Sequence, residues 1–179
     1  TITYVLAGTV EHGDSLGNRG AIASGDIQWM TAGSGIIHQE MPQGDAKGRM
    51  HGFQLWANLP SSLKMTAPHY QEVKSAEIPE LTDDDGTNAR IICGNLWGTK
   101  GPVDGIAAEP NYFDVTVPPG KRKRIPVATT RHAFAYVFAG SGTFGNASGL
   151  MPVRTDGVGV SDAAPYSEID DRSLVLFDR

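Results

Sequence analysis

The residues best suited to chemistry are an imidazole and a carboxylate one residue apart, His38 and Glu40. They follow a glycine-rich bend at residues 31–35, and residues 36–41 are predicted to form a β-strand because apolar residues flank the pair. Side chains two apart in a strand leave from the same face, with their bases roughly 6–7 Å apart. Both could therefore reach one cation, and Ile36 is expected to form an apolar wall on the same face.

A pair of this spacing also occurs on solvated strands, so the motif alone is weak. Inside a barrel, however, a histidine and a carboxylate must be either paired or bound to a metal, because unpaired burial is costly. Residues 25–42 contain no lysine or arginine that could serve as a partner. Two ligands do not hold a metal firmly, so a metal site here requires further donors from elsewhere.

Other reactive side chains have simpler interpretations. His51 opens an aromatic strand and is the remaining histidine best placed to line a pocket, whereas His12 is expected to be solvated in a polar hairpin and His69 to lie in a loop. Cys93, the single cysteine, is expected to be a small buried hydrophobe rather than a nucleophile. The basic cluster at residues 121–124 is expected to decorate an exposed turn.

Composition limits the classes of function. Among 179 residues, 40% are hydrophobic, which permits a packed core. Fifteen basic and twenty acidic residues give a net charge of -5, so no direct binding to nucleic acid or to an anionic membrane is expected. One cysteine permits no intrachain disulfide, and no apolar run approaches the ~20 residues of a membrane span, so we expect a cytoplasmic protein, or a nuclear one in a eukaryote.

The elements that must position these residues are short strands. Twenty-two glycines and eleven prolines punctuate the chain, and no sustained helical period is present. The predicted strands are residues 2–6, 20–22, 27–30, 36–41, 53–59, 89–93, 112–117, 134–138 and 174–177. Many short strands with turns between them predict an all-β sandwich or barrel.

An internal repeat predicts two related domains. TITYVLAG at residues 1–8 matches AFAYVFAG at residues 133–140 in four positions, and both run into glycine-rich turns. A polar break at residues 83–86 is the best boundary, which gives domains at residues 1–85 and 86–179. Because strands begin and end the chain abruptly, we expect it to be truncated at both ends.

Four segments together resemble one family. TITYVLAG, EHGDSLGNRG (residues 11–20), GDIQWMTAGSGIIHQEMP (residues 25–42) and HGFQLWANLP (residues 51–60) closely resemble the pirins, a branch of the cupin superfamily. The resemblance covers nearly the whole chain and is densest over residues 1–71. It implies two tandem cupin barrels, a bicupin, with one metal in the first domain.

The resemblance also implies a ligand set and an activity. Pirins carry a His-x-His pair just ahead of the strand that matches residues 2–6, so two further histidine ligands are expected upstream of Thr1, joining His38 and Glu40 around Fe(II). In the second domain the repeat places Pro126 and Ala128 where that pair would fall, so no metal is expected there. Zn, Mn, Co, Ni or Cu could occupy the same ligands.

Two functions follow from such a centre. The first is a quercetin 2,3-dioxygenase-type oxidoreductase that acts on a flavonol and O2, with Glu40 as catalytic base. The alternative is an iron-dependent, redox-sensitive regulator that binds a transcription factor or a metabolic enzyme without turnover.

Overall fold

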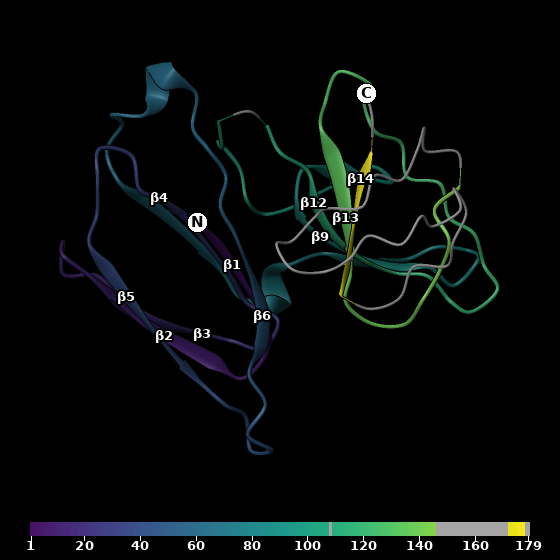
Figure 1. The fold of residues 1–179 in the computed structure, drawn as a ribbon, viewed down its shortest axis with the longest axis horizontal. Coiled ribbons are helices and arrows are strands. Elements are labelled where there is room, and N and C mark those ends of the chain that lie inside the picture. The colour runs from purple at the N-terminus through teal and green to yellow at the C-terminus, as the bar shows by residue number, and fades with distance from the viewer. Residues whose placement is uncertain (108, 146–171, 178–179) are drawn as a thin grey trace, which may run out of the picture. The chain divides into compact units, whose positions relative to one another are not determined.

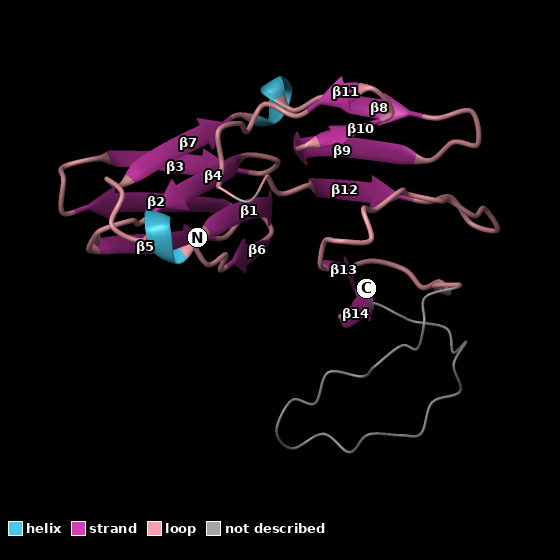
Figure 2. Cartoon of the chain, turned by 90° about the horizontal axis from the view of Figure 1, so that it is seen from above, coloured by secondary structure: helices cyan, strands magenta, loops and turns pink. Residues whose placement is uncertain are grey.

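The computed structural model describes residues 1–107, 109–145 and 172–177, and these fold almost entirely as β-structure (Figures 1 and 2). The strands are β1 (Ile2–Ala7), β2 (Thr9–Asp14), β3 (Arg19–Ala23), β4 (Ile27–Thr31), β5 (His38–Gln43), β6 (His51–Leu55), β7 (His69–Val73), β8 (Glu80–Thr82), β9 (Asn88–Cys93), β10 (Asn95–Leu96), β11 (Thr99–Lys100), β12 (Tyr112–Thr116), β13 (Ala133–Val137) and β14 (Ser173–Phe177). Two short 3-10 helices, η1 (Ser61–Leu63) and η2 (Ser75–Glu77), are the helical elements of this part of the chain. The predicted all-β class is confirmed.

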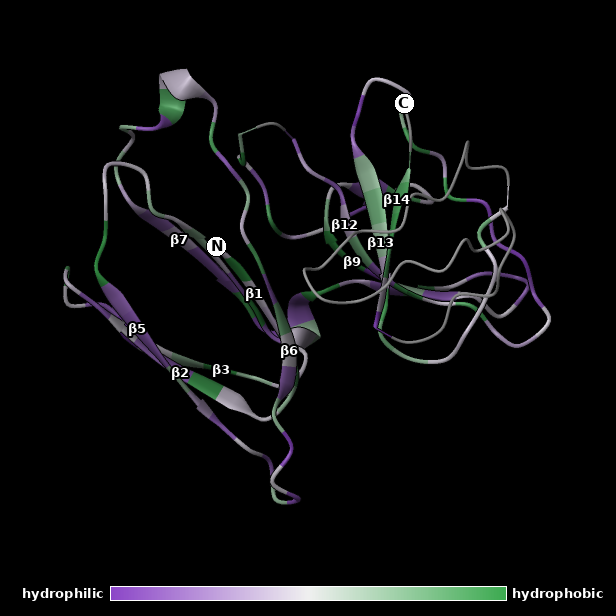
Figure 3. Cartoon of the chain, viewed as in Figure 1, coloured by the Kyte–Doolittle hydropathy of each residue, from purple (hydrophilic) through white to green (hydrophobic). Residues whose placement is uncertain are grey.

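The first barrel is built from two antiparallel sheets that face each other (Figure 1). One has the strand order β6-β1-β4-β7 and the other the order β3-β2-β5. Figure 3 colours β5 and β7 mostly as hydrophilic and β1 more as hydrophobic. Both sheets therefore carry polar as well as apolar residues, and strand alternation decides which of them face the interior.

Alternation along β1 separates two environments. Ile2 and Tyr4 belong to a core that continues beyond the first barrel, whereas Val5 packs inside it against Val10 and Ile22. Because successive side chains point to opposite faces, Thr3 shares the inward face with Val5. The interior of the barrel is thus apolar around Val5 and polar beside Thr3.

The larger core joins this barrel to a second sheet of order β12-β9-β8. Its members are buried side chains on both sides of residue 85: Ile2, Tyr4, Ile27, Trp29, Val73, Ile78, Ile92, Cys93 and Val103. Cys93 is 4% exposed, its Sγ lies 3.4 Å from the Val103 carbonyl oxygen, and burial raises the pKa of its thiol. The prediction of a buried, unreactive cysteine is therefore supported.

A polar link crosses the same core. The Tyr4 hydroxyl donates to Asp114 Oδ2 at 2.7 Å and accepts from Arg90 Nη1 at 2.7 Å. The other terminal nitrogen of Arg90 donates to the Gly25 carbonyl oxygen at 3.2 Å and to Ser75 Oγ at 2.9 Å. Tyr4 is only 2% exposed, so this hydroxyl joins β1 to β9 and β12 away from water.

The chain divides into two compact units, Thr1–Lys123 and Arg124–Arg179. The predicted boundary near residue 85 falls between β8 and β9, which pair with each other in one sheet. The division into two cupin domains at that point stays a prediction. In the second unit, β13 pairs with β14 from Ala133–Phe177 to Val137–Ser173.

Several strands were missed or placed differently by the sequence patterns. Strands β2, β7, β8, β10 and β11 were not predicted, and His69, expected in a loop, begins β7. Lys123 was expected in an exposed turn but is only 14% exposed, because it pairs with Asp83 and Asp85 and lies 4.8 Å from the centre of the Trp97 ring. Within the described residues, no helix is long and apolar enough to cross a membrane.

Candidate metal centre

Strand β5 carries both residues of the predicted half-site. It pairs with β2 so that His38 lies opposite Asp14 and Glu40 opposite His12. Strand alternation therefore places His38 and Glu40 on one face, as the spacing predicted. The strand begins at His38, two residues later than predicted, so Ile36 lies before it and the expected apolar wall is not part of the ladder.

The Glu40 carboxylate reaches across the interior to the opposite sheet. Gln54 Nε2 donates to Glu40 Oε2 at 2.6 Å, and Thr3 Oγ1 donates to Glu40 Oε1 at 3.3 Å. Thr3 and Gln54 are themselves cross-strand partners on β1 and β6. Both carboxylate oxygens are thus held by neutral donors from two strands, which fixes the direction of the side chain.

His38 lies at the exposed start of β5. It lines a cavity of about 550 Å³ together with its own neighbours Ile37, Gln39 and Met41 and with residues of β2 and β3, among them His12 and Arg19. Glu40 is not among the residues that line this cavity. His38 is accessible to solutes, whereas Glu40 is held further inside the barrel.

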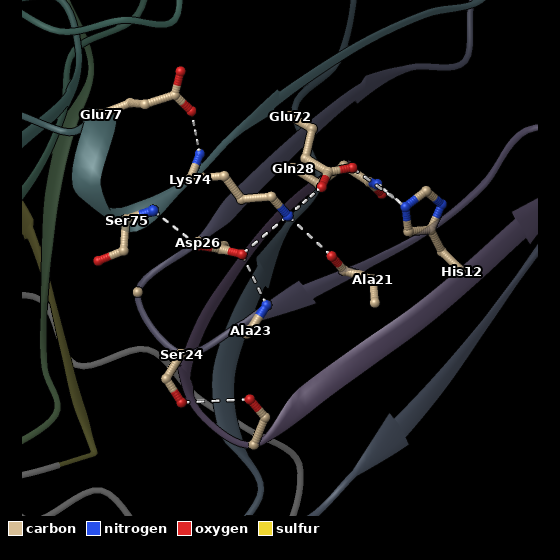
Figure 4. A network of polar contacts seen from close by, with 12 residues as sticks. His12, Ala21, Ala23, Ser24, Asp26, Gln28, Glu72, Lys74, Ser75 and Glu77 are labelled. Atoms are coloured by element: carbon tan, nitrogen blue, oxygen red, sulfur yellow. Dashed lines mark hydrogen bonds and ion pairs between the residues drawn. The ribbon is translucent and has the colours of Figure 1, made fainter.

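His12 is a candidate that the sequence patterns missed, and its predicted solvation is wrong. Its side chain is 8% exposed, and its ring stacks on Tyr70 with the centroids 6.2 Å apart. His12 Nε2 lies 2.8 Å from Gln28 Nε2 and 3.5 Å from Glu72 Oε2 (Figure 4). One signal in the sequence pointed to its burial: His12 is two residues from the apolar Val10, so the two share a face of β2, and Val10 is buried.

A glycine makes room for this ring. A Cβ at Gly20, the cross-strand partner of His12, would lie 2.6 Å from His12 Nε2. Contacts this short are not tolerated without movement of one group. The absence of a side chain at Gly20 therefore lets His12 pack inward.

A phenol completes this side of the interior. Burial and a hydrogen bond to Asp14 raise the pKa of Tyr70 to about 12, so its hydroxyl stays protonated at neutral pH. Burial opposes ionisation of Asp14, but hydrogen bonds from Asn18, and one from Tyr70, lower its pKa to about 2. Near neutral pH the end of β2 therefore holds a charged carboxylate beside a neutral phenol.

His51 lies in a different setting. It begins β6, and its ring meets Phe53 edge-on with the centroids 5.7 Å apart. Alternation places these two rings on the face of β6 opposite to Gln54, and Phe53 packs against the larger core. No part of the candidate centre is therefore based on His51, and its role in lining a pocket stays a prediction.

His38 and Glu40 offer the donor types of half a metal site. An imidazole nitrogen and a carboxylate oxygen are the donor types that suit a first-row divalent metal. Among the described residues, no group of three or more histidine, cysteine, aspartate or glutamate side chains is placed to hold a metal ion. His38 and Glu40 would need donors in addition to these.

Known proteins match the same part of the chain. The family described as Pirin matches residues 1–57. A pirin-like protein of Caulobacter vibrioides is 48% identical over 141 residues, which is 78% of this chain and 51% of that protein. The chain spans about half the length of the curated relatives it matches.

Solved structures show the same fold. A protein of Geobacillus kaustophilus is 33% identical with a TM-score of 0.77, over 99% of this chain and 63% of that one. A quercetin 2,3-dioxygenase from Acinetobacter baumannii is 28% identical with a TM-score of 0.65, over 99% of this chain and 56% of that one. With sequence, fold and strand arrangement in agreement, the chain belongs to the pirin family of the cupin superfamily.

Proposed function

We propose that this chain carries half of a non-haem iron centre and acts as a quercetin 2,3-dioxygenase-type oxidoreductase. His38 and Glu40 would bind Fe(II) together with two histidines encoded ahead of Thr1. The observation that carries the proposal is the inward Glu40 carboxylate, held by Gln54 and Thr3 on the same strand face as His38. The similarity to a dioxygenase of that name supports the substrate class, a flavonol with O2.

The chain's own residues would have separate tasks. His38 would bind the cation at the accessible edge of the barrel, where the 550 Å³ cavity admits solutes. Glu40 would bind the same cation from within and accept the proton of a substrate hydroxyl, a role that a positioned carboxylate can fill. When bound, iron would supply the Lewis acidity and the reaction with O2.

The surrounding side chains would limit access of water. Val5, Val10 and Ile22 close part of the interior with apolar surface. A partly dry site strengthens the interactions between a carboxylate, a cation and a bound hydroxyl. Less water there would favour transfer of a proton from a bound substrate hydroxyl to Glu40.

The test uses the protein expressed from its complete gene, loaded anaerobically with Fe(II). We expect His38→Ala and Glu40→Gln to weaken iron binding by more than about a hundredfold, since loss of a hydrogen-bonding partner of a ligand alone costs 10–100-fold. Gln43→Ala, on the opposite face of β5 and outside the cavity, is the matched control and should bind iron as the unaltered protein does. Oxygen uptake on addition of quercetin is then measured.

Two results would count against parts of the proposal. Unchanged iron binding in both ligand variants would remove the metal centre itself. An iron-replete protein that consumes no oxygen with quercetin would remove the dioxygenase activity and leave the redox-sensitive regulator. The regulator would in turn be rejected if ferrous and ferric protein recovered the same partners in equal amounts.

A further inference from the structure

Three side chains form a hydrogen-bonded chain that ends on Glu40. Trp56 Nε1 donates to Gln54 Oε1 at 2.9 Å, and Gln54 Nε2 donates to Glu40 Oε2 at 2.6 Å. Gln54 Nε2 also lies 3.2 Å from Thr3 Oγ1. The chain runs from an exposed indole at the end of β6 to the candidate ligand on β5.

The chemistry of the two ends fixes the direction of the amide between them. An indole N–H can only donate, so it requires the amide oxygen of Gln54. The amide nitrogen must then face Glu40, where a carboxylate can only accept. The orientation of the Gln54 amide, which is ambiguous in many structures, is therefore determined by its neighbours.

The backbone under Gln54 is also constrained. Gln54 lies opposite Thr3, and Gly52 lies opposite Val5 in the same antiparallel pair. A Cβ at Gly52 would lie 2.6 Å from the Tyr4 carbonyl oxygen, so β6 approaches β1 more closely there than a larger residue would allow. This close pairing holds the Gln54 side chain at a fixed height in the barrel.

We propose that Gln54 is the positioning residue of Glu40 and that Trp56 sets the orientation of Gln54. The proposal rests on the proposed function in one respect, namely that Glu40 binds the metal. Gln54 occupies Glu40 Oε2 with a short hydrogen bond, whereas Oε1 has only the longer contact from Thr3. Oε1 is thus the oxygen available to a cation, and the rotamer that presents it is held before any metal binds.

This assignment also accounts for an exposed aromatic side chain. Trp56 is 83% exposed, which is unusual for the largest apolar side chain. Its ring contributes little by burial, but its N–H has a specific acceptor. The group that matters at this position is therefore the indole donor. Trp56→Phe keeps an aromatic ring and removes the N–H, so it separates the effect of the hydrogen bond from that of the ring.

The test compares Gln54→Leu and Trp56→Phe with Gln43→Leu in the protein expressed from its complete gene. Gln54 and Gln43 are both exposed, but Gln43 lies on the face of β5 opposite to Glu40 and outside the cavity that His38 lines, so the two leucine variants are matched. Cobalt(II) is the probe, because its visible absorption reports ligand geometry and its affinity can be titrated. Exchange of the Trp56 indole proton, identified by its loss in Trp56→Phe, is followed by NMR in metal-free protein.

We expect Gln54→Leu to weaken cobalt binding about 10–100-fold and to alter the visible spectrum, as loss of a ligand's hydrogen-bonding partner does. Trp56→Phe should weaken binding about tenfold, the lower end of that range, because Gln54 remains but its amide can turn. Gln43→Leu should leave both affinity and spectrum unchanged. In metal-free protein the indole proton should exchange slowly, and Gln54→Leu should make it exchange rapidly.

The outcomes separate this inference from the proposed function. If Gln54→Leu binds cobalt with unaltered affinity and spectrum, the positioning role is refuted while the metal centre stands. If the unaltered protein binds no cobalt, the proposed function fails, and indole exchange alone then decides whether the hydrogen-bonded chain exists. Slow indole exchange that persists in Gln54→Leu would refute the chain in either case.

Discussion

The carboxylate of Asp26 ties three segments together and offers a quantitative test of the fold beneath the candidate site. Asp26 is 6% exposed. Its Oδ2 accepts from the Ala23 N–H at 3.0 Å and from Lys74 Nζ at 3.2 Å, and its Oδ1 accepts from the Ser75 N–H at 2.8 Å (Figure 4). These bonds join the end of β3, the start of β4 and the residues that follow β7.

Replacement of Asp26 by asparagine keeps the shape of the side chain and removes its charge. Each hydrogen bond to a charged group contributes about 1.5–3 kcal/mol, and asparagine can still accept at one oxygen. The new NH2 group must then face an N–H donor that loses its acceptor. We therefore expect Asp26→Asn to lower the free energy of unfolding by about 2–3 kcal/mol at pH 7.

The loss should depend on pH in a defined direction. Burial alone would raise the pKa of Asp26, but the N–H groups of Ala23 and Ser75 and the Lys74 ammonium hold it below its ordinary value. A carboxyl whose pKa is lower in the folded state stabilises the fold above its unfolded pKa, about 3.9. That stability is lost as the pH falls through the folded pKa, so the difference between the two proteins should shrink below about pH 4.

Urea unfolding at pH 7, 4 and 2.5, followed by tryptophan fluorescence, measures this difference. Asp45→Asn is the control, because Asp45 bonds only to Lys47 and Arg49 within its own turn, and its replacement should have the smaller effect. Equal stability of Asp26→Asn and the unaltered protein at pH 7 would refute the reasoning. So would a difference that stays the same at pH 2.5.

Further predictions concern packing around the site. Gly20→Ala should destabilise the fold by about 1–3 kcal/mol in urea unfolding, because its Cβ would meet the His12 ring. Gly13→Ala is the control: the nearest atom to its Cβ is 3.8 Å away, and the stability should change by less than about 0.5 kcal/mol. Tyr4→Phe should cost about 1–3 kcal/mol in the same measurement, because the half-buried Arg90 guanidinium and Asp114 carboxylate lose their shared partner. No loss would show that water replaces the hydroxyl. Cys93 should react with a thiol reagent only on unfolding, and rapid labelling of the folded protein would contradict its burial.

The sequence allowed the shared strand face of His38 and Glu40 to be predicted because it depends on local geometry. The spacing of His38 and Glu40 determines that they share a strand face, whatever the rest of the chain does. The first residue of this strand was less predictable. Ile37 N donates to Ser15 Oγ at 3.2 Å, and the Ser15 N–H donates to the Ile37 carbonyl oxygen at 2.8 Å, so a turn distant in sequence decides where the ladder begins.

His12 and Lys123 show why the remainder escaped prediction. The neighbours of His12 in sequence are polar or glycine, which is typical of a solvated hairpin, yet its partners Gln28, Tyr70 and Glu72 come from β4 and β7. Lys123 lies in a basic run, yet its two acidic partners lie about forty residues earlier. Burial of a polar side chain is decided by contacts that no local pattern contains.

The polar position in β1 links the fold to the proposed chemistry. In a strand with Ile2, Tyr4 and Val5 as buried neighbours, Thr3 is 8% exposed, and an apolar residue there would pack without any need for hydrogen bonds. Its hydroxyl instead donates to Glu40 and lies within reach of Gln54. The buried Thr3 hydroxyl, level with the inward Glu40 carboxylate, departs from the apolar pattern expected of a strand in the core. Such departures are expected where a fold must hold a functional group rather than only fill its core.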